Sequence, residues 1–321
     1  MRAAKIIING VELEVGGISG VYSFNGRAGA VIPQATDYDK FFAYPRYTYD
    51  GVNIKDKFKG EMDYTEPWIW VQQRLAARDI SGLHIKDFFE VTAGGNLLQM
   101  QIADINHDLG FMDTEITAFH IDFISKDLWP ELHVWNKVNY NNGIAAEANP
   151  WLCSDLKAWL NSEKGEVPNE DKASPQTVSV DYSATGVFDK LPVSLQSIIV
   201  ERRNLEPTRY TAGQLLTDDA GFEWKNIGKL WVPNEIEVYS FIVWGTRSGY
   251  NCGSSHQFPM FLDGRNRIKH LGTVGNRCTW WLRSALSNSS TSAASVGAGA
   301  SSYNAAWSNS VGAPVCFRIS G

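Results

Sequence analysis

The 321-residue sequence lacks the long apolar runs that mark membrane-spanning and exported proteins. No stretch approaches the roughly 20 consecutive apolar residues of a membrane helix. The N-terminus has only three consecutive isoleucines before Asn9-Gly10, which is too short for the apolar part of a signal peptide. We therefore expect a soluble protein that does not insert into a membrane and carries no recognisable leader.

Close pairs of metal ligands are also missing. The four cysteines lie far apart, and the six histidines form neither an H-E-x-x-H nor an H-x-H pattern. The run Asp104-Ile105-Asn106-His107-Asp108 places oxygen ligands at alternate positions, as calcium loops do, but it lacks the glycine and distal glutamate of an EF-hand. We expect reduced, mostly buried thiols, a solvated turn at 104–108, no metal and no cofactor.

No charge of one sign dominates the chain. Lys and Arg number 29 and Asp and Glu 35, so the net charge is -6, and no block of like charge occurs. A nonspecific nucleic-acid-binding protein needs a basic stripe, so nucleic acid is not an expected partner. The sequence also has no G-x-S-x-G motif, no P-loop and no G-x-G-x-x-G motif. We therefore expect a binding protein rather than an enzyme.

The twelve tryptophans are unevenly distributed, because all of them lie between Trp68 and Trp307. The Trp-free start instead has two short β-type runs, 5–8 and 11–15, on either side of Asn9-Gly10. Such a dipeptide between two strand-like runs predicts a β-hairpin. We predict a small β-ribbon segment over residues 1–66 and a larger domain over residues 67–321.

Residues 23–38 read SFNGRAGAVIPQATDY, a turn-rich stretch in which Pro33 excludes a helix. This stretch resembles the FNGRTGAV-PQ-GDY element of bacteriophage tail-fibre and tail-tip proteins, from which it departs at Ala28 and Ile32. The resemblance implies that 1–66 attaches the chain to other phage tail proteins and forms a homotrimer. It also implies a protein made in the bacterial cytoplasm and located in the virion.

The larger domain is predicted to mix strands with short helices, which is an α+β fold class. Two apolar runs around Gly94-Gly95, at 88–92 and 97–102, predict a hairpin. N-capping residues or prolines before amphipathic stretches predict helices over 154–161, from 191 to about 203, and from 233. A final strand is predicted over 314–319.

The segment 284–313 has an unusual composition, with ten Ser, eight Ala and no charged residue among thirty. Composition of this kind is typical of flexible linkers. A linker joins two folded units, however, and only eight residues follow the segment. We therefore predict an ordered surface between core strands, with its short side chains exposed.

A series of short motifs precedes and enters this segment. They are Trp151-x-x-Ser154-Asp155-Leu156, Trp159-Leu160-Asn161, Phe188-Asp189-Lys190-Leu191-Pro192, Leu230-x-x-Pro233-x-Glu235 and Trp280-Trp281-Leu282-Arg283-Ser284. Their order resembles a domain family common in phages and gut bacteria, many of whose members are variable proteins of diversity-generating retroelements. Near the end, Gly312-Ala313-Pro314-Val315 departs from that family's usual Gly-Val-Arg-Pro-Ala. The resemblance implies a C-type-lectin-like domain with short helices and irregular loops.

The same resemblance implies that 284–313 is a diversified ligand-binding surface. Such retroelements randomise adenines, typically in Asn codons, and every residue of the segment except Trp307 belongs to the set that this process can reach. The implied partner is a host-cell surface protein or glycan, bound by rigid aromatic and adaptable polar side chains as in antibody paratopes. The candidate ligand-binding residues are Asn288, Ser289, Ser290, Ser292, Ser301, Ser302, Tyr303, Asn304, Trp307 and Ser308.

The alternative function is an enzyme. The lectin-like fold is shared by formylglycine-generating-type enzymes, which depend on cysteines near the active centre. Here Cys278 and Cys316 flank the Ser/Ala-rich segment, although buried core thiols are the plainer interpretation. Calcium-dependent sugar binding is not expected, because neither Glu-Pro-Asn nor Gln-Pro-Asp occurs.

Overall fold

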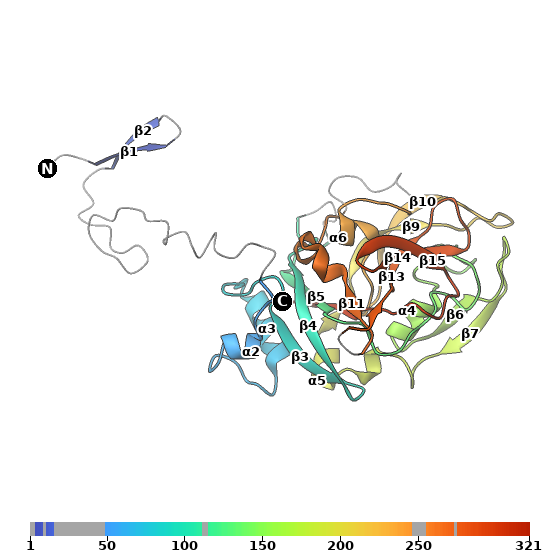
Figure 1. Ribbon diagram of the computed structural model, residues 1–321, viewed down its shortest axis with the longest axis horizontal. Coiled ribbons are helices and arrows are strands. Elements are labelled where there is room, and N and C mark those ends of the chain that lie inside the picture. Colours follow the sequence, from blue (N-terminus) through green and yellow to red (C-terminus); the bar gives the residue numbers. More distant parts are fainter. Residues whose placement is uncertain (1–3, 9–10, 16–48, 111–114, 246–254, 273–274) are drawn as a thin grey trace. The chain divides into compact units, whose positions relative to one another are not determined.

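The computed structural model describes residues 4–8, 11–15, 49–110, 115–245, 255–272 and 275–321 (Figure 1). The chain divides into two compact units, Met1–Tyr49 and Asp50–Gly321. In the first unit β1 (Ala4–Ile8) and β2 (Val11–Val15) pair antiparallel, which confirms both predicted strands. The Asn9-Gly10 turn and the tail-fibre-like segment 23–38 lie outside the described residues. Among the described helices, none has the length and apolar character needed to cross a bilayer.

The second unit is built on a five-stranded antiparallel sheet, which curls into half a barrel. Its strands, in spatial order, are β3 (Phe88–Ala93), β4 (Asn96–Ile105), β5 (His120–Ser125), β16 (Cys316–Ser320) and β8 (Ile199–Val200). The C-terminal strand therefore lies inside the sheet, between β5 and β8. The predicted final strand is confirmed, and its central place explains why its apolar side chains are buried.

Helix α3 (Pro67–Ala76) packs on this sheet. Its Trp68 ring contacts Phe89, Phe123 and Phe317, with ring centroids 4.6, 5.3 and 5.6 Å away. The short helix α2 (Ile54–Lys57) precedes it, and its Ile54 is fully buried in the same core. Residues 50–66, which the sequence analysis groups with the N-terminal ribbon, thus contribute an apolar side chain to the large unit.

The β3–β4 hairpin forms where the sequence predicts it. Gly94 and Gly95 both have positive φ, 56° and 81°, as a two-residue turn of this hand requires. Two helices are confirmed as well, each with its cap. Ser154 caps α4 (Asp155–Leu160), and Asn234 and Glu237 form a reciprocal capping box on α6 (Glu235–Tyr239).

The helix predicted from 191 to about 203 is wrong in its extent. Only α5 (Val193–Gln196) is helical, and the chain then turns into β8, where Ile199 pairs with Ile319. Consecutive β-branched residues favour the strand here. Arg202, near the predicted end of the helix, is instead fully buried among carboxylates.

A chain of buried ion pairs surrounds Arg202. Its guanidinium contacts Asp108 at 3.3 Å and Glu237 at 2.7 Å. Arg318 joins Asp108 to Asp122, and Arg283 joins Glu237 to Glu206. Burial opposes ionisation of Glu237, but the two arginines outweigh it and hold the pKa of that carboxyl well below its ordinary value. The network links β5, β16, β9 and β13 through the core.

Residues 284–313 are ordered, mainly as strands of a three-stranded sheet formed by β13 (Trp280–Ala285), β14 (Ser292–Gly297) and β15 (Ala300–Ala305). Trp280, Trp281 and Leu282 are fully buried. The expected exposure of the short side chains is wrong for β14, in which residues 293–296 are fully buried. As the middle strand, β14 is covered by β13 and β15 at its edges, and its small side chains let neighbouring elements approach closely.

The remaining described elements are two-stranded ribbons and 3-10 turns. They are β6 (Lys164–Pro168) with β7 (Thr177–Asp181), β9 (Arg203–Thr208) with β10 (Gly221–Asn226), β11 (Lys269–His270) with β12 (Arg277–Cys278), η1 (Phe188–Lys190), η2 (Pro259–Leu262) and η3 (Gly264–Arg267).

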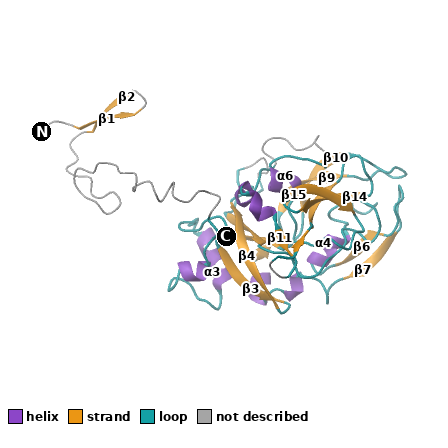
Figure 2. Cartoon of the chain, in the orientation of Figure 1, coloured by secondary structure: helices purple, strands orange, loops and turns teal. Residues whose placement is uncertain are grey.

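These elements overturn the predicted fold class. In the part of the chain that the structure describes, strands hold 32% of the residues and helices 16%, and these helices are short, so this part is mostly β (Figure 2). The principal sheet is a curled antiparallel half-barrel, and nothing in the comparisons below connects it to C-type lectins. The α+β, C-type-lectin-like prediction is therefore wrong. It depended on short motifs whose order constrains local turns and caps but does not fix how the sheets are connected.

Candidate ligand-binding site

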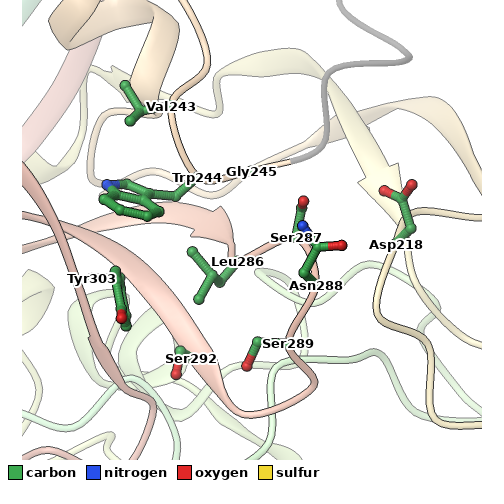
Figure 3. A pocket seen from close by; sticks show the side chains of 10 residues that line it. All are labelled: Asp218, Val243, Trp244, Gly245, Leu286, Ser287, Asn288, Ser289, Ser292 and Tyr303. Atoms are coloured by element: carbon green, nitrogen blue, oxygen red, sulfur yellow. The ribbon is translucent and has the colours of Figure 1, made fainter.

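An open cavity of about 790 Å³ lies beside β14 and β15 (Figure 3). We call it the Trp244 pocket. It is lined by Asp218, Val243, Trp244, Gly245, Leu286, Ser287, Asn288, Ser289, Ser292 and Tyr303. Four of the ten predicted ligand-binding residues, Asn288, Ser289, Ser292 and Tyr303, are therefore brought together in one pocket.

Two aromatic rings form one wall of the pocket. The Trp244 and Tyr303 rings meet edge to face, with centroids 4.8 Å apart. The indole Nε1–H of Trp244 donates a hydrogen bond to the hydroxyl of Ser301, another predicted residue, at 2.8 Å. In Figure 3 both rings lie at one end of the pocket and Asp218 lies at the other, with Leu286 between them. The wall offers a flat apolar surface beside several polar groups.

The backbone that carries Trp244 is fixed by a buried carboxylate. Glu235, in the first turn of α6, accepts hydrogen bonds from the backbone N–H groups of Trp244 at 3.0 Å and Gly245 at 2.7 Å. A third bond comes from Val243 at 3.3 Å. Glu235 is fully buried, and its hydrogen bonds turn the backbone of 243–245 around the carboxylate. A buried residue that does not itself line the cavity therefore orients the aromatic wall.

The floor of the pocket is the β13–β14 connection, residues 286–292, which is held through its carbonyl groups. The buried guanidinium of Arg209 donates to the carbonyls of Leu286 and Ser289, each at 2.8 Å. The Asn141 side chain donates to the carbonyls of Ser289 and Ser292, and its backbone N–H donates to the carbonyl of Ser290 at 2.9 Å. Arg209 and Asn141 therefore hold this segment through main-chain carbonyl groups, which every residue type has.

The side chains of the floor make far fewer hydrogen bonds than its backbone does. Among the described residues, the side chains of Ser287, Asn288 and Ser292 make no hydrogen bond, whereas the Ser289 hydroxyl accepts one from the backbone of Thr291. Asn288 has a φ of 60°, a left-handed conformation that asparagine adopts more readily than most residues. The side chains at 287 and 292 can therefore change without the loss of a described hydrogen bond, whereas most replacements at 288 would also strain the backbone.

The other predicted residues are not part of the pocket. Side chains alternate along β15, so Ser302 and Asn304 point to the face opposite Ser301 and Tyr303. There the Asn304 amide donates to the buried Ser295 hydroxyl at 2.9 Å. Ser290 contributes its carbonyl to the Asn141 contact. Trp307, which is 59% exposed, and Ser308 follow β15 and do not line the cavity.

Sequence reasoning missed the residues that shape the pocket. Trp244 and Asp218 lie well before the Ser/Ala-rich segment. Asn141 and Arg209 act on the backbone of residues far along the chain, and Glu235 acts on the backbone of the loop that follows its own helix. The run Asn139-Tyr140-Asn141-Asn142 was the one local signal, because clustered asparagines often bond to backbone groups.

The two cysteines of the enzyme alternative are poorly placed for thiolate chemistry. Cys316 is fully buried in β16, and burial raises the pKa of its thiol well above the ordinary value. Burial also raises the pKa of Cys278, which is partly exposed. The Trp244 pocket itself is lined by one carboxylate, Asp218, with hydroxyl, amide and aromatic groups. This set is suited to hydrogen bonding and ring stacking with a polar ligand.

Comparison with known proteins identifies one family. The sequence model of a family described as "Domain of unknown function (DUF6273)" matches residues 119–321, which is more than half of the chain and includes every residue that lines the Trp244 pocket. Neither the curated proteins nor the solved structures gave a significant match.

Proposed function

The chain belongs to the DUF6273 domain family, and we propose that it is a receptor-binding protein of a phage tail whose Trp244 pocket binds a glycan on the host-cell surface. In this proposal a retroelement diversifies the side chains around the pocket, and the domain binds its ligand without catalysis. A homotrimer formed through the N-terminal segment would present several pockets at once, which raises a weak single-site affinity to a useful avidity.

The observation that carries the proposal is the way the pocket floor is held. Arg209 and Asn141 fix residues 286–292 through main-chain carbonyls, so replacing the side chains at 287, 288 or 292 removes no described hydrogen bond. A surface that must accept many sequences needs this separation between a fixed backbone and variable side chains. Antibody loops combine adaptable polar residues with rigid aromatic ones in the same manner.

The pocket favours a glycan over a protein epitope. Its volume, about 790 Å³, is in the range of small-ligand sites, whereas a stable protein interface covers about 800 Å² on each partner. The Trp244 ring can pack against the apolar face of a sugar ring. The carboxylate of Asp218 and the side chain of Asn288 can then pair with the sugar hydroxyls.

Binding of the full-length chain to an array of bacterial surface glycans tests the proposal. We expect Trp244→Ala to weaken binding at least about tenfold, which corresponds to about 1.4 kcal/mol. Trp307→Ala is the matched control, because Trp307 is exposed but does not line the cavity, and it should change binding less than about twofold. Equal effects of both variants would contradict the pocket assignment, and cell binding that survives enzymatic removal of surface glycans would point to a protein receptor.

A further inference from the structure

Three side chains with metal-ligating atoms converge at the end of β4, away from the residues of the Trp244 pocket. The Asp104 carboxylate Oδ2 lies 2.6 Å from Nδ1 of His107 and 3.3 Å from Nε2 of His256. All three ligand atoms lie within 4.8 Å of one another. We propose that Asp104, His107 and His256 bind a transition-metal ion of the Zn²⁺ type.

The donor set matches that class of ion. Two imidazole nitrogens and one carboxylate oxygen are common ligands of Zn²⁺, which holds them at about 2.0–2.2 Å. Such bond lengths place neighbouring ligand atoms about 3.3 Å apart in a tetrahedral site. The distance of 3.3 Å between His256 Nε2 and Asp104 Oδ2 already equals this separation. The distance of 2.6 Å between His107 Nδ1 and Asp104 Oδ2 would increase on metal binding. The His256 side chain is 38% exposed, which leaves room for water as a fourth ligand.

The surroundings of the His107 Nε2 atom support a metal more specifically. His107 is buried, and its Nε2 has no hydrogen-bond partner among the described residues but lies 3.8 Å from the carboxylate of Asp108. If neutral His107 keeps its proton on Nδ1 to bond Asp104, the Nε2 lone pair faces a second carboxylate. A metal on Nδ1 moves the proton to Nε2, where it points toward Asp108. This is the carboxylate–histidine–metal arrangement that orients ligands in known sites.

The surroundings hold the ligands in place. Asp104 Oδ1 accepts a hydrogen bond from the backbone of Ile105 at 2.7 Å, which fixes the carboxylate. The His107 ring lies against His256, with centroids 3.9 Å apart, and against Phe258 at 4.4 Å.

A neighbouring group of similar composition lacks this character. Asp108, His120 and Asp122 also lie close together, but the guanidinium of Arg318 already joins the two carboxylates. Burial and that same Arg318 lower the pKa of His120 to about 4. A cation is therefore built into this second group, whereas in the described structure no arginine or lysine contacts Asp104. A metal on the first group would tie the segment at His256 to the end of β4.

Metal binding to the tag-free full-length chain tests the proposal. After dialysis against a chelator, titration calorimetry with Zn²⁺ should show one equivalent bound in the micromolar range or tighter. His256→Gln should weaken that affinity by at least about tenfold. His270→Gln is the matched control, because His270 is also partly exposed and bonded to an aspartate, Asp127, at 3.0 Å. It should leave Zn²⁺ affinity unchanged within about twofold.

Titration with Co²⁺ gives a second measurement that needs no variant. A tetrahedral site with nitrogen ligands should produce visible absorption bands that Zn²⁺ removes. Absence of Zn²⁺ binding by the wild-type chain, or equal affinity in His256→Gln and wild type, would overturn the proposal. Either result would indicate that the cluster is held by hydrogen bonds alone.

Discussion

The indole Nε1–H of Trp244 donates a hydrogen bond to the hydroxyl of Ser301 at 2.8 Å and so joins the loop after α6 to strand β15. Ser301 is one of the predicted variable residues, but its hydroxyl accepts this hydrogen bond and so helps to orient the Trp244 ring. Ser301→Val removes the acceptor and should weaken glycan binding about fivefold, or about 1 kcal/mol, because the ring loses its orientation. Isothermal calorimetry measures this. Ser308→Val is the control, and an equal loss there would show that the hydrogen bond is irrelevant to binding.

Arg209→Met should loosen the floor of the pocket. The change removes the Arg209 donor from the carbonyls of Leu286 and Ser289 and leaves Asn141 as their remaining described donor, which should cost about 1 kcal/mol for each lost hydrogen bond. Hydrogen exchange followed by mass spectrometry should show faster exchange at the amides of residues 286–292. Arg265→Met, at a largely exposed arginine, should leave their exchange rates as in wild type. Unchanged exchange in Arg209→Met would contradict the role assigned to Arg209.

Glu235→Gln should disturb the aromatic wall from a distance. The carboxylate accepts three backbone N–H groups, and an amide can offer only its one oxygen to them. We expect a loss of about 1–3 kcal/mol in the free energy of unfolding. Tryptophan fluorescence should also shift, because Trp244 moves toward water. Stability and fluorescence equal to wild type would show that the loop holds its conformation without Glu235.

Trp281→Ala tests the packing of β13 in the core. Trp281 is fully buried, and its indole N–H donates to the carbonyl of His133 at 2.8 Å. Large-to-small replacement should cost about 3–5 kcal/mol in urea unfolding. Trp307→Ala, at an exposed tryptophan, should cost less than about 0.5 kcal/mol. A small loss at Trp281 would mean that β13 packs less tightly than the structure describes.

Lys269 should make the free energy of unfolding depend on pH in the alkaline range. Its ammonium is buried against the carbonyls of Ser125 and Lys126, and burial lowers its pKa to about 8 despite the nearby Cys316 and Asp127. Between pH 8 and its ordinary pKa of 10.5, the unfolded chain keeps this proton and the folded chain does not. Stability from this group therefore rises with pH across that window, by up to about 3 kcal/mol.

The variant Lys269→Met isolates this contribution. The difference in unfolding free energy between wild type and Lys269→Met should move in favour of wild type as the pH rises from 7.5 to 10. Urea titrations of both proteins at each pH measure the difference. A difference that stays constant with pH would show that Lys269 titrates normally.

Local signals in the sequence predicted local structure well. Ser154, the Asn234 capping box and Gly94-Gly95 mark elements through contacts between residues a few positions apart, so a sequence pattern can predict them. The helix from 191 was predicted too long because its apolar spacing also fits the strand that β8 forms beside β16. The order of the sheets is set by contacts between distant segments, and short motif resemblances led to the wrong fold class.

Some residues of the candidate site could also be predicted from the sequence, and others could not. The Ser/Ala-rich composition pointed to Asn288, Ser292 and Tyr303, which do line the pocket. Composition could not distinguish the two faces of β15, so Ser302 and Asn304 were included although they point the other way. Trp244, Asn141 and Arg209 were missed, because their roles at the pocket arise only when segments distant in sequence are brought together.

In the proposed function the pocket side chains vary on a fixed framework, and deep sequencing of the encoding gene in a growing host population tests this variation. We expect substitutions to be concentrated in adenine-containing codons around the pocket, at positions such as 292 and 303. The codons of Asn141, Arg209 and Trp244 should stay constant, because these residues hold the backbone and the aromatic wall. A 3′ end that remains static, or substitutions spread evenly over framework and pocket, would contradict the account.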